Sequence, residues 1–152
     1  MLRIPKKYSL YLSMVLSIIF FIGCVVGAIG MPALAETLID VKGAPLAHAD
    51  FTLVLVLAYL ILLSVSLADG LLFWLLMRVR RGLVFTRTST DLVRGISWCC
   101  MLLGALCFGM GWYFRLSLVL AFAALLLGIC LRVVKNVLEE ASEIKSENEL
   151  TI

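Results

Sequence analysis

Asp69 is the residue of this chain best placed to do chemistry, because it is a carboxylic acid inside a long apolar stretch. Arg78 is the next charged residue, about 13 Å further along a helix axis at ~1.5 Å per residue. A carboxylate at that depth has to be paired, hydrated or protonated. One interpretation is a proton, cation or polar-ligand site. The other is an internal polar contact, satisfied by Ser66, by water, or by Arg94 or Arg132 reaching inward.

Apart from Asp69, the sequence contains no recognisable set of catalytic or metal-binding residues. No stretch pairs an acid with a base, or a nucleophile with an orienting partner. The one histidine, His48, lies beside Asp50 in a polar segment, and no cysteine or histidine cluster has the spacing of a metal site. We therefore expect no enzyme activity, no metal and no cofactor.

Four apolar stretches must position Asp69, and they fill most of the 152 residues. Each approaches or exceeds the ~20 residues that cross a bilayer as a helix. We expect an all-α fold, an integral membrane four-helix bundle in a single domain over residues 1–152. The expected spans are about 10–29, 51–77, 96–114 and 116–134, with a cytoplasmic loop at 78–95 and a cytoplasmic tail at 135–152.

The basic residues indicate the orientation of the spans. Four spans place both termini and the 78–95 loop on one side, and that side carries eleven of the thirteen lysines and arginines. The positive-inside rule assigns it to the cytoplasm. We therefore expect a multi-pass protein of a bacterial cytoplasmic (inner) membrane, in contact with the lipid bilayer and with both termini inside.

Small residues in the spans favour close helix packing. Gly23 and Gly27 are four residues apart, as are Ala105 and Gly109, and this spacing lets two backbones approach closely. We expect these four positions to serve packing within the bundle. Association of identical chains is the alternative.

The two cytoplasmic segments have opposite charges. Five arginines and one aspartate lie between 78 and 94, whereas 135–152 holds two lysines and five glutamates. Apolar residues from Val133 to Ile144 recur at helical spacing, which predicts a short amphipathic C-terminal helix. The two segments are expected either to dock on each other or to bind a partner.

Polar motifs in these two segments resemble those of a bacterial family of small four-helix membrane proteins, domain-of-unknown-function family 2975. The first motif is the sequence RGLVFT at 81–86 followed by LVRGI at 92–96, and the second is ENELTI at 147–152. Glu149 stands where the family usually has aspartate, which keeps the charge. The residues that carry the resemblance are Arg81, Gly82, Phe85, Thr86 and Arg94 in the loop, and Glu147, Asn148, Glu149, Leu150, Thr151 and Ile152 in the tail.

The resemblance implies a membrane component paired with a small cytosolic helix-turn-helix regulator of the Cro type, often encoded beside it. We therefore favour a regulatory or sensory membrane protein whose loop and tail bind such a partner. Direct binding of nucleic acid is not expected, because the basic residues flank membrane spans. Two other classes stay open: a small transporter or immunity-type protein that uses Asp69, and an accessory or self-associating membrane subunit.

Overall fold

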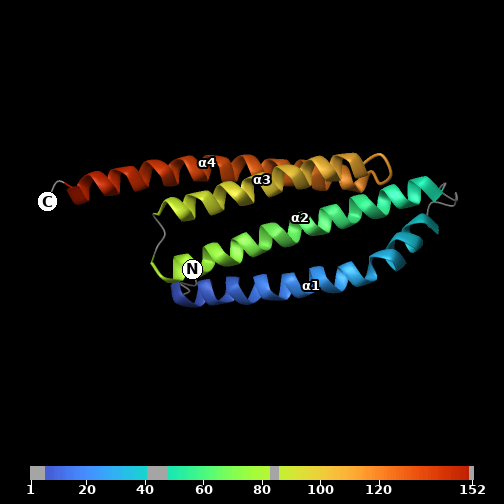
Figure 1. The fold of residues 1–152 in the computed structure, drawn as a ribbon, viewed down its shortest axis with the longest axis horizontal. Coiled ribbons are helices and arrows are strands. Elements are labelled where there is room, and N and C mark those ends of the chain that lie inside the picture. Colours follow the sequence, from blue (N-terminus) through green and yellow to red (C-terminus); the bar gives the residue numbers. More distant parts are fainter. Residues whose placement is uncertain (1–5, 41–47, 83–85, 151–152) are drawn as a thin grey trace, which may run out of the picture.

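The four apolar stretches form four long α-helices in the computed structural model, which describes residues 6–40, 48–82 and 86–150 (Figure 1). These helices are α1 (Lys6–Asp40), α2 (His48–Arg80), α3 (Arg87–Met110) and α4 (Leu116–Leu150). Each is long and apolar enough to cross a membrane, and no strand occurs within those three ranges. The fold is therefore all-α, with the architecture of a multi-pass membrane protein.

The helices pack in chain order as an open row, α1 on α2, α2 on α3 and α3 on α4 (Figure 1). Over the described ranges, α1 contacts neither α3 nor α4, so the four helices do not close around a common core. Large apolar side chains are exposed around much of α1. Such a helix is stable among lipid tails, because between helices in lipid there is no hydrophobic force that closes a bundle.

Pro32 lies inside α1, which continues past the predicted end at residue 29 to Asp40. Proline has no backbone N–H, so the carbonyl of Ala28, one turn earlier, loses its helical partner. The Tyr59 hydroxyl of α2 donates a hydrogen bond to that carbonyl at 3.2 Å. This contact satisfies a backbone oxygen that lipid could not.

α2 ends and α3 begins at the end of the helix row where we expect the cytoplasm. Gly82 follows α2 with φ of 76°, a left-handed conformation that glycine adopts without strain. Thr86 has extended backbone angles and is the N-cap of α3, and its carbonyl accepts the backbone N–H groups of Ser89 and Thr90. The predicted loop 78–95 is consequently shorter in the structure, because both helices extend into it.

The closest helix contact is between α3 and α4, at glycines that the packing prediction did not select. A Cβ atom on Gly104 would lie 2.6 Å from Leu125 Cγ, and one on Gly128 would lie 3.0 Å from Met101 Cγ. Ser97 on α3 donates a hydrogen bond to the Gly128 carbonyl at 2.7 Å. Two backbones can approach in this way only where side chains are absent.

The four predicted packing positions lie mostly away from helix contacts. A Cβ atom on Gly23 or Gly109 would meet no atom within 4 Å, and Ala105 is exposed. Gly27 faces α2, 3.9 Å from Leu62 Cδ1, an ordinary van der Waals distance. The four-residue spacing of small residues did not reveal which face of each helix meets its neighbour.

The predicted tail is not a separate helix, since α4 continues without a break to Leu150. The two ends of α3 also differ from the predicted span 96–114, because α3 begins at Arg87 and ends at Met110. The C-terminal end of α4 extends past the ends of the other three helices (Figure 1). The last turns of α4 therefore stand clear of the row.

Candidate functional site

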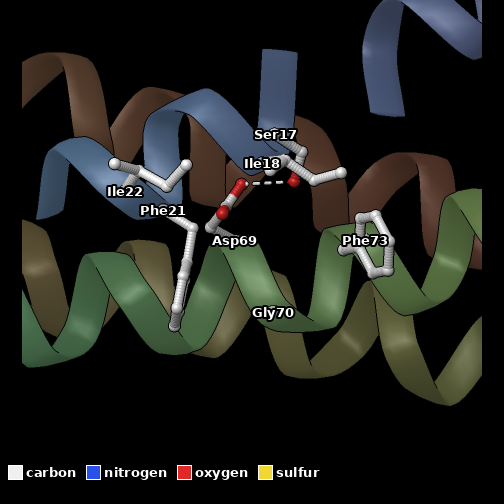
Figure 2. A pocket seen from close by; sticks show the side chains of 7 residues that line it. All are labelled: Ser17, Ile18, Phe21, Ile22, Asp69, Gly70 and Phe73. Atoms are coloured by element: carbon white, nitrogen blue, oxygen red, sulfur yellow. Dashed lines mark hydrogen bonds between the residues drawn. The ribbon is translucent and has the colours of Figure 1, made fainter. Parts of the chain in front are cut away.

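Asp69 is buried between α1 and α2, with 8% of its surface exposed. The hydroxyl of Ser17 on α1 donates a hydrogen bond to Asp69 Oδ1 at 2.8 Å (Figure 2). The partners are 52 positions apart in the chain. This side-chain contact ties α1 to α2 within the apolar region, where a polar group without a partner is costly.

A crevice of about 280 Å³ adjoins this hydrogen bond. Asp69 and Ser17 are its polar residues, and its other walls are apolar (Figure 2). Such a crevice can hold an apolar group that carries one cationic or hydrogen-bonding atom. The lining residues are Ser17, Ile18, Phe21, Ile22, Asp69, Gly70 and Phe73.

The partners proposed for Asp69 from the sequence lie elsewhere. The Ser66 hydroxyl donates to the carbonyl of Leu62 on its own helix, at 2.9 Å. Arg94 pairs with carboxylates on α3 and α4, and Arg132 lies over the ring of Trp98. Ser17 was missed because nothing in a single sequence shows which residue of α1 faces Asp69.

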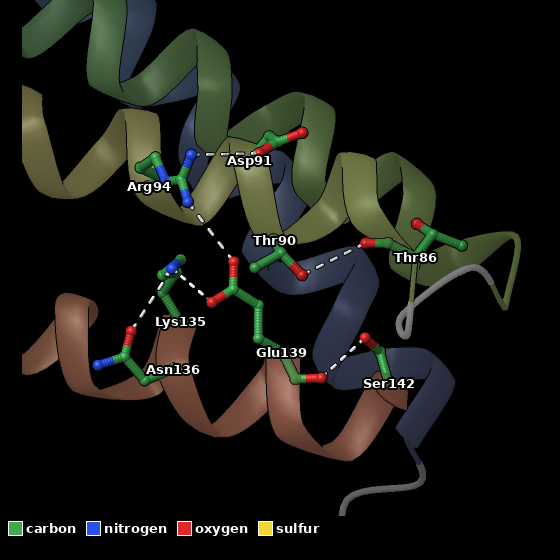
Figure 3. Close-up of polar contacts among 8 residues, drawn as sticks. All are labelled: Thr86, Thr90, Asp91, Arg94, Lys135, Asn136, Glu139 and Ser142. Atoms are coloured by element: carbon green, nitrogen blue, oxygen red, sulfur yellow. Dashed lines mark hydrogen bonds and ion pairs between the residues drawn. The ribbon is translucent and has the colours of Figure 1, made fainter. Parts of the chain in front are cut away.

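A second polar site joins α3 to α4 near the end of the bundle where α4 projects. Glu139 accepts from Lys135 at 2.5 Å and lies 3.5 Å from the Arg94 guanidinium (Figure 3). Arg94 also lies 3.9 Å from Asp91. The basic loop segment and the acidic tail segment therefore meet at Arg94 and Glu139, one of the two alternatives left open by the sequence.

The described residues of the loop motif lie just after α2 and at the start of α3. Gly82 provides the left-handed residue, Thr86 begins α3, and Arg81 is exposed beside them. Arg78 on α2 reaches the start of α3, where its Nη2 atom donates to the Thr86 hydroxyl at 3.5 Å. Phe85 lies outside the described residues. Gly82 and Thr86 thus mark the end of α2 and the start of α3.

The tail motif has a less complete description. The backbone of Glu147, Asn148, Glu149 and Leu150 belongs to α4, while their side chains, together with Thr151 and Ile152, lie outside the description. The structure therefore gives the direction of this segment but none of its contacts.

No group of three or more histidine, cysteine or acidic residues could hold a metal ion in the part of the chain that the structure describes. The two polar sites differ in chemistry. The Asp69 site is a single acid in apolar surroundings, whereas the Arg94–Glu139 site is a mixed-charge cluster at the edge of the apolar region.

Comparison with known proteins places the chain in a family. No curated protein and no solved structure gives a significant match. A family model described as "Protein of unknown function (DUF2975)" matches residues 3–152, nearly the whole chain, in agreement with the motifs in the loop and the tail. The chain therefore belongs to the DUF2975 family.

Proposed function

We propose that this protein is a regulatory component of a bacterial cytoplasmic membrane, without enzyme activity, that holds a small soluble regulator at the inner surface. The observation that carries the proposal is the projection of α4 past the other helices (Figure 1). The distribution of lysine and arginine favours the cytoplasm for that end.

The projecting part of α4 has two distinct faces. One face packs toward α3 through Lys135 and Glu139, and the ion pair with Arg94 fixes its base. The opposite face carries exposed Val137, Glu140 and Ile144, at the spacing of residues on one side of a helix. Exposed apolar residues beside an acid are typical of a helix that inserts into a groove of a partner.

The chemistry of this face indicates the kind of partner. The apolar side chains require an apolar groove, and the acidic residues of the tail favour a basic rim. A small helix-turn-helix protein has a basic DNA-binding surface, so the partner implied by the family resemblance fits these requirements.

Recruitment to the membrane tests this proposal. The chain would be co-expressed with a small helix-turn-helix protein of the Cro type that the family resemblance implies, carrying a fluorescent label, and the membrane-bound fraction of the label would be measured. We expect recruitment by the full chain, and loss of recruitment when residues 145–152 are deleted or Ile144 is replaced by Ser. Ser142→Ala is the matched control, because Ser142 lies on the face toward α3 and bonds within its own helix.

Equal recruitment by the full and the shortened chain would contradict the proposal, and so would a cytosolic label in every strain. Membrane insertion of each variant would be checked by resistance to carbonate extraction. This control distinguishes a variant that has lost the binding face from one that no longer inserts into the membrane.

The crevice at Asp69 supports a second candidate function, a transport or immunity-type protein that takes a cationic group within the membrane. The observation that supports this function is the buried carboxylate of Asp69, which lines an otherwise apolar crevice. Asp69→Asn should then abolish binding of an amphipathic amine while Ser17 keeps a hydrogen-bond acceptor. Loss of stability without loss of binding would instead identify Asp69 as a packing contact.

A further inference from the structure

A cavity of about 410 Å³ lies between α3 and α4, beside the Arg94–Glu139 ion pair. Three cationic side chains and no carboxylate line it. Its other walls supply a hydroxyl, an amide and an indole ring. The lining residues are Arg94, Ser97, Trp98, Arg132, Lys135 and Asn136.

The position of the cavity along the helices corresponds to lipid headgroups. Arg94 is the last charged residue before the apolar part of α3, and Arg132 is the first after the apolar part of α4. Trp98 lies one turn further into the apolar part than Arg94, and tryptophan is enriched at this level of a membrane. The cavity is therefore at the boundary between hydrocarbon and headgroups.

The charges around the cavity leave a positive excess. Arg94 pairs with Asp91 and Glu139, and Lys135 pairs with Glu139, so two carboxylates balance these two cations and leave the charge of Arg132 in excess. The guanidinium of Arg132 lies 5.1 Å from the centre of the Trp98 ring, and none of the described carboxylates pairs with it. The ring holds Arg132 in place without neutralising it.

We propose that this cavity binds the phosphate of an anionic lipid headgroup, with Arg132 and Lys135 as its principal contacts. Arginine suits a phosphate because its planar guanidinium can donate two parallel hydrogen bonds. Basic pockets between membrane helices on the cytoplasmic side are a recurring form of anionic-lipid site. The proposal does not depend on the partner proposed for α4.

A lipid phosphate fits better than a soluble one because of what surrounds the cavity. Trp98 on α3 is 58% exposed, and Ile129, three residues before Arg132 on α4, is exposed as well. A lipid whose phosphate lies at Arg132 can place its acyl chains along these apolar side chains. A free phosphate would gain nothing from them.

Binding of defined lipids to the full-length protein tests this proposal. The protein would be purified in a neutral detergent, and phosphatidylglycerol, phosphatidylcholine or inorganic phosphate would be titrated in separate arms and counted by native mass spectrometry. We expect phosphatidylglycerol to bind most tightly. Arg132→Gln should weaken it about fivefold, the change that corresponds to ~1 kcal/mol per basic residue.

Arg81→Gln is the matched control, because Arg81 is an exposed arginine of the same end that does not line the cavity. Arg132→Lys should keep most of the binding. Circular dichroism measures the helix content of each variant, and Lys135→Gln is tested in place of Arg132→Gln if the latter does not fold.

Equal weakening of lipid binding by Arg81→Gln and Arg132→Gln would overturn the proposal, as would equal binding of phosphatidylglycerol and phosphatidylcholine. Displacement of the lipid by inorganic phosphate would identify a soluble-anion site instead.

Discussion

Replacing Gly104 with alanine should separate α3 from α4, whereas the same change at Gly109 should not. A Cβ atom on Gly104 would lie 2.6 Å from Leu125 Cγ and 3.2 Å from the Ala121 carbonyl oxygen. Carbon atoms pack at about 3.5–4.0 Å, so either Leu125 leaves its rotamer or the helices move apart. A Cβ atom on Gly109 meets nothing within 4 Å.

The expected magnitudes follow from these contacts. Overfilling a packed interface costs about 1–3 kcal/mol. Alanine is favoured over glycine within a helix by roughly 0.5–1 kcal/mol, which offsets part of that cost. We therefore expect Gly104→Ala to destabilise the protein by about 1–2 kcal/mol and Gly109→Ala to leave stability unchanged or slightly higher.

Unfolding in mixed micelles, with increasing sodium dodecyl sulfate and circular dichroism as the signal, measures both changes. Leu125→Ala in the Gly104→Ala background should recover part of the loss, because it creates the space that the new methyl group needs. Equal stability of the two alanine variants, to within about 0.5 kcal/mol, would contradict the close contact between α3 and α4. A Gly104→Ala protein more stable than the original would refute it outright.

Two further substitutions test the polar contacts. Ser17→Ala removes the donor to Asp69 and should destabilise the α1–α2 pair by about 0.6–1.7 kcal/mol in the same titration. Asp69→Asn keeps an acceptor and should cost less stability, so a larger loss for Asp69→Asn than for Ser17→Ala would contradict the hydrogen bond. Glu139→Gln removes a carboxylate that pairs with Arg94 and Lys135. Because Arg94 and Glu139 are about half-exposed, the loss of stability should be at most about 1 kcal/mol and should shrink in 1 M salt. A loss that salt leaves unchanged would argue against the ion pairs.

The helices could be predicted from the sequence because each membrane span is encoded locally. A run of about 20 apolar residues has one favourable structure in lipid, since every backbone polar group must be bonded within the segment. The helix ends were less predictable. The first span was predicted to end at about residue 29, yet α1 continues through Pro32 to Asp40. Tyr59, far away in the chain, donates to the backbone oxygen that the proline leaves without a partner.

The sequence indicated that polar side chains within the spans need partners, but it did not identify the residues that form the contacts between helices. Asp69 was identified as a buried acid that needs a partner, but Ser17 was chosen by the packing of α1 on α2. Arg94 was one of the candidate partners of Asp69, and it pairs with Glu139, because both lie at the polar end of α3 and α4. The open row of helices also depends on packing between helices, which the hydropathy of the individual spans does not predict.

Photo-crosslinking from the projecting end of α4 tests the central proposal most directly. A photoreactive amino acid would replace Ile144 in cells, and Val119, exposed at the other end of α4, would serve as the control position. We predict that light produces an adduct between position 144 and the small helix-turn-helix protein, and none from position 119. Adducts from position 144 that contain only lipid or a second copy of the chain would contradict a regulator bound to α4.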